Sequence, residues 1–335
     1  MSKQLTVSLS PHEKGDLSVK QIMWGVVIAL IPTFLASVYF YGLNSLRVVF
    51  LSVTFCIVSE FLIQEFILKV KVTAFDGSAA VTGLLLAFNV PSGIPWWQLL
   101  VGAIAAIGIA KMAFGGLGNN PFNPALVGRA VMLASFPVQM TTWPEPMQKI
   151  WTFGADAVTT ATPLTSLKDA IREGKRIVDL ADLIPSYFDL FIGNVGGCVG
   201  GISVVAILLG GFYMLYKKII TYHIPVFFLL SMVAFTGVFW LIDPDKYVDP
   251  LFHILAGGVM LGAWFMATDM VTGPMSIKGQ IVFAVGGGIL CGAIRLFGTY
   301  PDGVAYAILI MNAFVPLIDK YFKPKRFGKE VNYEQ

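Results

Sequence analysis

The sequence has 335 residues, of which 56% are hydrophobic and only 13% are charged. An ordinary soluble domain has roughly 45–50% apolar and about 25% charged residues, so these proportions exclude a typical soluble protein. The formal net charge of +3 is small for this length, and the basic residues form no patch interleaved with aromatic side chains. We therefore expect no nucleic-acid binding, and membrane lipid as the partner of most of the chain.

Ten apolar runs follow one another along the chain, and a helix that crosses a bilayer needs about 20 such residues. The first five runs are residues 19–41, 46–68, 79–90, 96–110 and 125–136. After a polar stretch from residue 138 to about residue 189 come residues 195–216, 223–242, 252–267, 281–297 and 304–318. The pattern predicts an all-α polytopic membrane protein with about ten transmembrane helices.

Residues 79–90 and 125–136 are too short to cross a hydrocarbon core of roughly 30 Å at 1.5 Å per residue. Polar sequence rich in glycine or proline precedes both, with Asp76-Gly77-Ser78 before the first run and residues 118–124 before the second. We expect half-helices or broken helices here. Irregular backbone at membrane depth is tolerated only where it lines a cavity inside the protein.

The second half repeats this order weakly, because Asp249-Pro250 precedes the eighth run and residues 297–303 precede the tenth. An odd number of spans per half makes the two halves face opposite sides of the membrane. The sequence therefore predicts an inverted repeat of five plus five helices, with a functional site at the interface between the repeats.

Basic residues indicate the orientation, because short cytoplasmic segments are enriched in Lys and Arg. With the N-terminus inside, the short outer segments hold only Arg47, Lys246 and Arg295. The cytoplasmic segments hold fourteen basic residues: Lys3, Lys14, Lys20, Lys69, Lys71, Lys111, Lys217, Lys218, Lys278, Lys320, Lys323, Lys325, Arg326 and Lys329. We expect a cytoplasmic segment and first repeat at residues 1–137, an outer loop at 138–194, a second repeat at 195–320 and a cytoplasmic tail at 321–335.

Two charged residues fall inside apolar runs, where charges usually face a cavity and have a partner. For Arg129, a functional role and snorkelling of the side chain to the cytoplasmic face both stay open. For Glu60, pairing with a neighbouring helix and participation in an ion path both stay open. Cys56, Cys198 and Cys291 each stand alone, so we expect buried thiols and no metal site.

The polar stretch between the halves contains Asp156-Ala157-Val158-Thr159-Thr160-Ala161-Thr162-Pro163-Leu164. By itself this segment is typical of a threonine-rich loop that opens a short helix, with Thr165 or Ser166 as the N-cap. No His or Cys lies close in sequence to activate the Thr162 hydroxyl.

Several motifs together resemble the family of the RnfD subunit of the Rnf ion-translocating oxidoreductase and the related NqrB subunit of the sodium-translocating NADH:quinone reductase. The resemblance covers nearly the whole chain and is most specific in the eleven residues from Gly115 to Ala125. Its other parts are Ser10-Pro11-His12 with Ile22-Met23, Asp76-Gly77-Ser78 with residues 82–86, Pro95-Trp96-Trp97, Lys111 with Phe114, and residues 156–164.

The resemblance implies that a flavin transferase joins the phosphate of FMN to a threonine hydroxyl, at a motif of the form Asp-x-x-Ser/Thr-Gly-Ala-Thr. Asp156, Thr159 and Ala161 match this motif, and Thr162 would carry the FMN. Thr160 stands where the family has glycine. The family places this loop outside the membrane, in agreement with the count of basic residues.

A noncovalent flavin, riboflavin, is also implied by the family. We place it at the broken helices, where helix N-termini and amide side chains offer hydrogen bonds to a polar ring edge. The candidate residues are Asn119, Asn120, Asn123 and Asp76. The same residue types also form turns before proline, so a purely structural role stays open for them.

The resemblance implies a urea-transporter-like fold and a redox subunit, not catalytic alone, of an ion-translocating ferredoxin:NAD+ oxidoreductase in the bacterial cytoplasmic membrane. Its partners would be the A, B, C, E and G subunits and the flavin transferase, and the coupling ion would be Na+ or H+. Two alternatives stay open. One is an NqrB-type subunit, and the other is a channel or secondary transporter, which the repeat pattern alone would predict.

Overall fold

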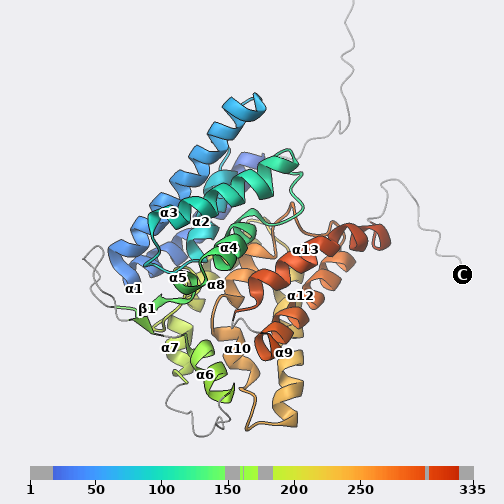
Figure 1. Cartoon of the computed structure of the whole chain (residues 1–335). Coiled ribbons are helices and arrows are strands. Elements are labelled where there is room, and N and C mark those ends of the chain that lie inside the picture. The colour runs from blue at the N-terminus through green and yellow to red at the C-terminus, as the bar shows by residue number, and fades with distance from the viewer. Residues whose placement is uncertain (1–17, 148–158, 161, 173–183, 299–301, 324–335) are drawn as a thin grey trace, which may run out of the picture.

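The computed structural model describes residues 18–147, 159–160, 162–172, 184–298 and 302–323. Almost all regular structure in these ranges is helical (Figure 1), apart from two short antiparallel strands, β1 (Trp143–Pro144) and β2 (Thr159–Thr160). Five helical segments are long and apolar enough to cross a membrane: Val19–Leu68, Trp96–Phe114, His223–Ile242, Ile277–Phe297 and Val304–Tyr321. The predicted class, an all-α polytopic membrane protein, is confirmed.

The first two predicted runs form one long, kinked element. Helix α1 (Val19–Leu62) continues into the π-helix η1 (Ile63–Leu68). Ser18 caps its start, where the hydroxyl accepts a hydrogen bond from Gln21 N at 3.2 Å. At Gly42 the backbone has φ 59° and ψ −137°, a conformation open to glycine and strained for other residues. This residue therefore allows the chain to change direction between the two predicted spans.

Both runs predicted to be half-helices are short helices, α2 (Ser78–Phe88) and α4 (Pro124–Ser135). The sixth run differs from the prediction, because α8 (Val204–Tyr216) begins nine residues later than the run that starts at Val195. The glycine-rich residues before α8 instead bond to the end of α2, with Gly200 N donating to Phe88 O at 3.0 Å. A Cβ at Gly200 would collide with the Phe88 side chain, so this approach depends on glycine.

The eighth run is also broken, although the sequence predicted broken helices only in the first half. It consists of α10 (Pro250–Leu255), α11 (Val259–Leu261) and the π-helix η5 (Gly262–Met266). The break lies between α10 and α11, where Gly257 has φ 71°. Each half of the chain therefore contains a helix that does not run continuously across the fold.

The remaining helices complete the bundle. Helix α3 (Trp96–Ile104) continues through η2 (Ala105–Lys111) and η3 (Met112–Phe114). The other helices are α5 (Pro137–Thr141), α6 (Pro163–Arg172), α7 (Tyr187–Ile192), α9 (His223–Ile242), α12 (Ile277–Phe297) and α13 (Val304–Tyr321). Helix α13 packs against α4 and η5, so elements from the two halves meet in the core.

Two ends of the bundle are distinguished by their contacts. At the end called here the terminal face, Gly77 lies against Met23 and Trp24, and Met275 N donates to Asp319 Oδ1 at 3.1 Å. At the opposite end, the loop face, Met147 N donates to Phe40 O at 2.8 Å. The strands and helices α6 and α7 belong to this end, and α6 and α7 lie together at the lower edge of Figure 1. The start of α1 and the end of α13 thus share one face, and the long polar stretch lies at the other.

Candidate functional site

A cavity of about 70 Å³ opens at the loop face between the two halves of the chain. Its wall includes Arg129 and Leu133 of α4, Thr162, and Asp302 from the connection before α13. The rest of the wall is mainly apolar or glycine: Met140, Thr141, Trp143, Pro163, Leu164, Leu190, Val195, Gly196, Gly197, Cys198, Gly201, Ile202, Leu255, Ala256, Gly257 and Gly258. The cavity therefore joins the predicted flavin attachment residue to a buried arginine and a partly buried aspartate.

Thr162 is positioned by the start of α6. Its hydroxyl accepts a hydrogen bond from Thr165 N at 3.2 Å and lies 2.8 Å from Thr165 Oγ1. Ser166 N donates to Thr162 O at 2.9 Å, which begins the helix. The predicted cap at Thr165 or Ser166 is wrong, because Pro163 has no N–H and suits the first helical position, which moves the cap to Thr162.

The strand pair holds the chain just before Thr162. Thr160 pairs with Trp143 and Thr159 pairs with Pro144. Asp156 and Ala161, the other two predicted motif residues, lie outside the described residues. Thr160, which stands at the glycine of the family motif, is thus paired with Trp143, a residue of the cavity wall.

Arg129, Asp302 and Arg295 form a buried network beside the cavity. Arg129 Nη2 lies 2.8 Å from Asp302 Oδ2, and Arg129 Nη1 donates to Asn89 Oδ1 at 2.8 Å. Arg295 Nη2 lies 3.2 Å from Asp302 Oδ1, and its guanidinium also donates to His253 O at 2.6 Å and Ala256 O at 3.0 Å. Arg129 is buried and paired, so the snorkelling alternative is wrong.

The network carries a surplus of positive charge, because one carboxylate serves two guanidinium groups. Asp302 lies in the connection between α12 and α13. Burial alone would raise the pKa of the Asp302 carboxyl. The nearby positive charges of Arg129 and Arg295 lower this pKa by more than burial raises it, so it lies below its usual range and the carboxylate is ionised. The Nε atoms of Arg129 and Arg295 are buried and have no hydrogen-bond partner among the described residues.

A second cavity, of about 70 Å³, lies at the terminal face. Asn120 and Asn123 line it, together with Ser78, Lys111 and Asp269. Asn120 Oδ1 is buried and has no partner among the described residues. The two halves meet here as well, because the wall includes residues of α1, α2, α8 and η5.

The four residues predicted for a noncovalent flavin are placed differently from one another. Asn123 caps α4 by accepting from Ala125 N at 3.1 Å, and its amide donates to Met266 O at 3.3 Å. Asp76 does not line the cavity but accepts from Ser78 Oγ at 2.5 Å. Asn119 is exposed and does not line it either. The structure brings only Asn120 and Asn123 to this cavity.

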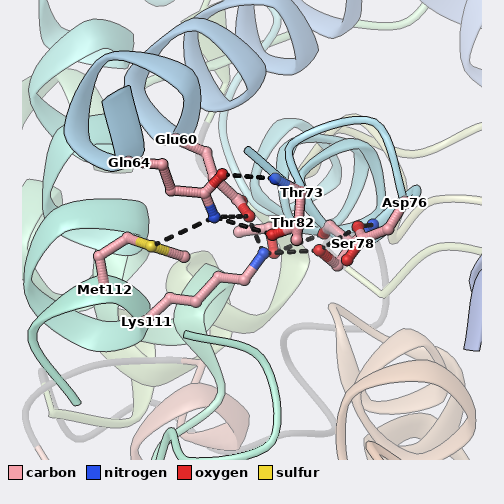
Figure 2. Close-up of polar contacts among 8 residues, drawn as sticks. All are labelled: Glu60, Gln64, Thr73, Asp76, Ser78, Thr82, Lys111 and Met112. Atoms are coloured by element: carbon pink, nitrogen blue, oxygen red, sulfur yellow. Dashed lines mark hydrogen bonds and ion pairs between the residues drawn. The ribbon is translucent and has the colours of Figure 1, made fainter. Parts of the chain in front are cut away.

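Lys111 and Glu60 form a buried ion pair next to this cavity (Figure 2). Lys111 Nζ lies 2.6 Å from Glu60 Oε2, and both side chains are 1% exposed. Lys111 Nζ also donates to Ser78 Oγ at 2.6 Å, and Ser78 N donates to Asp76 Oδ1 at 2.7 Å. The pairing alternative for Glu60 is the one observed. The sequence pattern predicted Lys111 among the charges of a cytoplasmic segment, whereas its side chain points into the bundle.

Gln64 extends this cluster along one helical turn from Glu60. Its amide nitrogen lies 3.3 Å from Glu60 Oε1 and donates to Thr73 Oγ1 at 2.9 Å, and its oxygen accepts from Thr73 N at 2.8 Å. The spacing of four residues between Glu60 and Gln64 places them on one helix face, a signal that the sequence contained. Polar groups from α1, η1, η2 and the start of α2 are thereby joined.

Cys56, Cys198 and Cys291 are buried free thiols, as the sequence predicted. In the part of the chain that the structure describes, no group of three or more His, Cys, Asp or Glu side chains is arranged to hold a metal ion.

Comparison with known proteins identifies the family of this chain. Residues 6–328 match the NQR2, RnfD, RnfE family. The D subunit of the proton-translocating ferredoxin:NAD(+) oxidoreductase complex of Clostridium ljungdahlii is 44% identical, over 96% of this chain and 96% of that protein. The D subunit of the Na(+)-translocating ferredoxin:NAD(+) oxidoreductase complex of Acetobacterium woodii is 45% identical, over 97% and 95%. The D subunit of the ion-translocating oxidoreductase complex of Pectobacterium atrosepticum is 37% identical, over 96% and 98%. The chain therefore belongs to the NQR2, RnfD, RnfE family.

Proposed function

We propose that this chain is the RnfD-type membrane subunit of an ion-translocating ferredoxin:NAD+ oxidoreductase complex, and that it carries FMN bound covalently to Thr162. The relatives with this printed function match almost the whole length of the chain. The protein is then a redox subunit that works with the A, B, C, E and G subunits. Maturation requires a flavin transferase that esterifies the Thr162 hydroxyl.

The position of Thr162 on the wall of the loop-face cavity carries the flavin part of this proposal. The wall around Thr162 is mainly apolar with a few polar groups, the kind of lining that is typical of small-molecule sites. Apolar side chains such as Trp143, Leu190 and Ile202 suit the faces of an aromatic ring system. The bound flavin supplies electron transfer, and the protein supplies its position and its electrostatic surroundings.

The start of α6 suits the phosphate that would link FMN to Thr162. Thr165 N and the Thr165 hydroxyl already contact the Thr162 oxygen, so they are available as donors to phosphate oxygens. The positive end of the helix dipole also stabilises negative charge at this position. With FMN attached at Thr162, the start of α6 would hold the phosphate, and the apolar residues of the cavity wall would be the ones available to the ring.

The terminal-face cavity is our candidate for the noncovalent flavin, riboflavin. Asn120 and Asn123 offer amide groups there, and Asn120 Oδ1 is buried without a partner among the described residues. A ring N–H of a flavin would supply the missing donor. The apolar part of the wall, which includes Val81, Leu85 and Phe265, suits the ring faces.

We further propose that the terminal face is cytoplasmic and the loop face is outside a bacterial cytoplasmic membrane. Among the described residues, the helix ends and connections of the terminal face carry the basic residues Lys20, Lys69, Lys71, Lys217, Lys218, Lys278, Lys320 and Lys323. Those of the loop face carry fewer exposed basic residues, such as Lys246. This asymmetry follows the enrichment of Lys and Arg in cytoplasmic segments.

The experiment is to produce the full chain together with the flavin transferase, denature it, and measure flavin fluorescence in the gel and the intact mass. The parent protein should fluoresce and gain the mass of FMN less water. Thr162→Ala should lose both signals, whereas Thr162→Ser, which keeps the hydroxyl, should retain them in part. Thr141→Ala is the matched control, because Thr141 is another threonine of the cavity wall, its hydroxyl donates to Pro137 O at 2.8 Å, and its loss should not affect attachment.

Two outcomes would contradict the proposal. A parent protein without bound flavin, produced alongside an active transferase, would remove the redox function and leave the channel or transporter alternative. A Thr162→Ala variant that keeps the full fluorescence would place the attachment at another residue.

A further inference from the structure

We infer that Arg129 faces the flavin carried by Thr162 and raises its reduction potential by stabilising the reduced, negatively charged form, while Asp302 limits this effect. The inference rests on the proposed covalent flavin. It assigns to these two buried residues a role in setting the driving force for electron transfer.

Arg129 is placed to act on a group inside the loop-face cavity. It projects from α4, is 5% exposed, and lines the same cavity as Thr162. Its Nη atoms are held by Asn89 and Asp302, which fixes the plane of the guanidinium. Its Nε is buried without a partner among the described residues, so one donor of this group is still unsatisfied.

The charges of the wall, counted together with Arg295 behind it, sum to a positive value. Of the described residues that line the cavity, Arg129 and Asp302 are the charged ones. Arg295 lies behind Asp302, with a side chain that is 0% exposed, and shares its carboxylate. Two guanidinium groups and one carboxylate leave a net charge of +1 beside a largely apolar space. The side chains of Arg129 and Arg295 are 6% and 0% exposed, so water screens their charge weakly.

Reduction changes the charge of the flavin and makes its energy sensitive to this surplus. Two electrons from a redox partner subunit and one proton convert the neutral oxidised ring to an anionic reduced ring. A nearby positive charge stabilises the product more than the reactant, which raises the reduction potential. Loss of the Arg129 charge should therefore lower the potential, and loss of the Asp302 charge should raise it.

A structural role for this ion pair would give a different result. Removal of either partner would then weaken the contact between α4 and the connection before α13, and both variants would change in the same way. Opposite shifts in potential are expected only if the flavin senses the two charges directly. The sign of the change thus separates the two explanations.

The test is an anaerobic redox titration of the full chain bearing its covalent flavin, followed by absorbance, with the Thr162→Ala protein as background for any noncovalent flavin. In Arg129→Gln, the reduced form should lose about tenfold or more in stability relative to the oxidised form, which lowers the potential by about 30 mV for this two-electron reduction. Arg129→Lys should stay within about threefold of the parent, because it keeps the charge. Asp302→Asn should shift the equilibrium in the opposite direction.

Arg47→Gln is the control for loss of a partly buried arginine. Arg47 is at the same face and, among the described residues, donates to Ser92 O at 3.4 Å and Ile94 O at 3.2 Å, outside the cavity wall. Its substitution should not move the potential. In-gel fluorescence and size-exclusion elution are measured for every variant, so that attachment and folding are known before the titration.

The outcomes separate this inference from the proposed function. A parent chain without covalent flavin would contradict the proposed function itself. A flavinylated parent whose potential is unchanged in both Arg129→Gln and Asp302→Asn, or shifted in the same direction, would overturn only the inference. Loss of attachment in Arg129→Gln with an unshifted potential in Asp302→Asn would also overturn it. If Arg129→Gln does not fold, Asp302→Asn decides by the direction of its shift.

Discussion

Lys111 and Arg295 each lie near the end of the fourth apolar run of their half of the chain, and both are buried, but their partners differ. Lys111 has its own carboxylate, Glu60, at 2.6 Å, and neither side chain is accessible to solvent. Arg295 shares Asp302 with Arg129, and Asp302 lines the cavity that contains Thr162. One cluster is an internally neutral pair, and the other has a surplus charge beside a space for a ligand.

This difference indicates two uses of buried charge in one fold. Glu60 comes from α1, Lys111 from η2, and Ser78 from the start of α2, so the neutral pair joins three elements at the terminal face. Burial of such a pair contributes little net stability, but separation of its partners is costly. At the loop face, Arg129, Arg295 and Asp302 together leave one positive charge unbalanced. Such a charge can stabilise a negatively charged group that lies next to it.

Lys111→Met should have the largest effect on stability, because it leaves the Glu60 carboxylate buried without its cation. We expect a loss of about 3–5 kcal/mol in the free energy of unfolding, measured by titrating detergent micelles with SDS. The double variant Glu60→Gln/Lys111→Met should recover much of this loss. Lys217→Met, at an exposed position of the same face, is the control and should be close to neutral. A loss below about 1 kcal/mol in Lys111→Met would show that the pair does not join these elements.

Gly83→Ala tests whether close packing, rather than the ion pair alone, holds α2 on α1. A Cβ at Gly83 would lie 2.6 Å from Val53 Cα and 3.0 Å from Ser52 O, and backbone atoms cannot yield without moving a helix. We expect a loss of about 1–3 kcal/mol in the same unfolding experiment. Gly108→Ala is the matched control, because its Cβ would meet only Ile63 Cδ1 at 3.5 Å and Ile104 Cγ2 at 4.0 Å. Equal stability of the two variants would contradict the role of close packing.

Of the three variants, Asn123→Ala should have the smallest effect on the free energy of unfolding. It also tests whether Asn123 binds a ligand in the terminal-face cavity. The variant loses the cap of α4, which costs about 1 kcal/mol. Asn119→Ala, at an exposed neighbour that does not line the cavity, should be close to neutral. The content of noncovalent flavin, measured after extraction with acid, should fall in Asn123→Ala and not in Asn119→Ala. Equal flavin content in both variants would limit Asn123 to a structural role.

Much of the architecture could be predicted from the sequence because it depends on local properties. The predicted bounds of residues 223–242 agree with α9, and the short runs 79–90 and 125–136 correspond to α2 and α4. The helix predicted at residues 195–216 was too long at its start, because a glycine-rich segment is apolar in composition whether or not it is helical. In the folded chain, its backbone amides find acceptors at the end of α2 instead.

The candidate site was predicted only in part. Thr162 was identified by resemblance to a family motif, whereas residues near it in sequence do not reveal what surrounds it. Arg129 and Asp302 are separated by 173 positions, and no local pattern relates them. The pairing of Lys111 with Glu60 was missed for a similar reason, because a lysine at the end of an apolar run is equally compatible with an exposed helix end.

By itself, the sequence determined that this is an all-α membrane protein with short helices inside the bundle, because span length and apolar composition are set residue by residue. Thr162 became the residue to test only through the resemblance of its segment to a family motif. Only the tertiary structure decided what these residues do together, since ion pairs and cavities depend on distances between segments far apart in the chain. The surplus charge beside Thr162 exists because two arginines from different halves of the chain share one carboxylate.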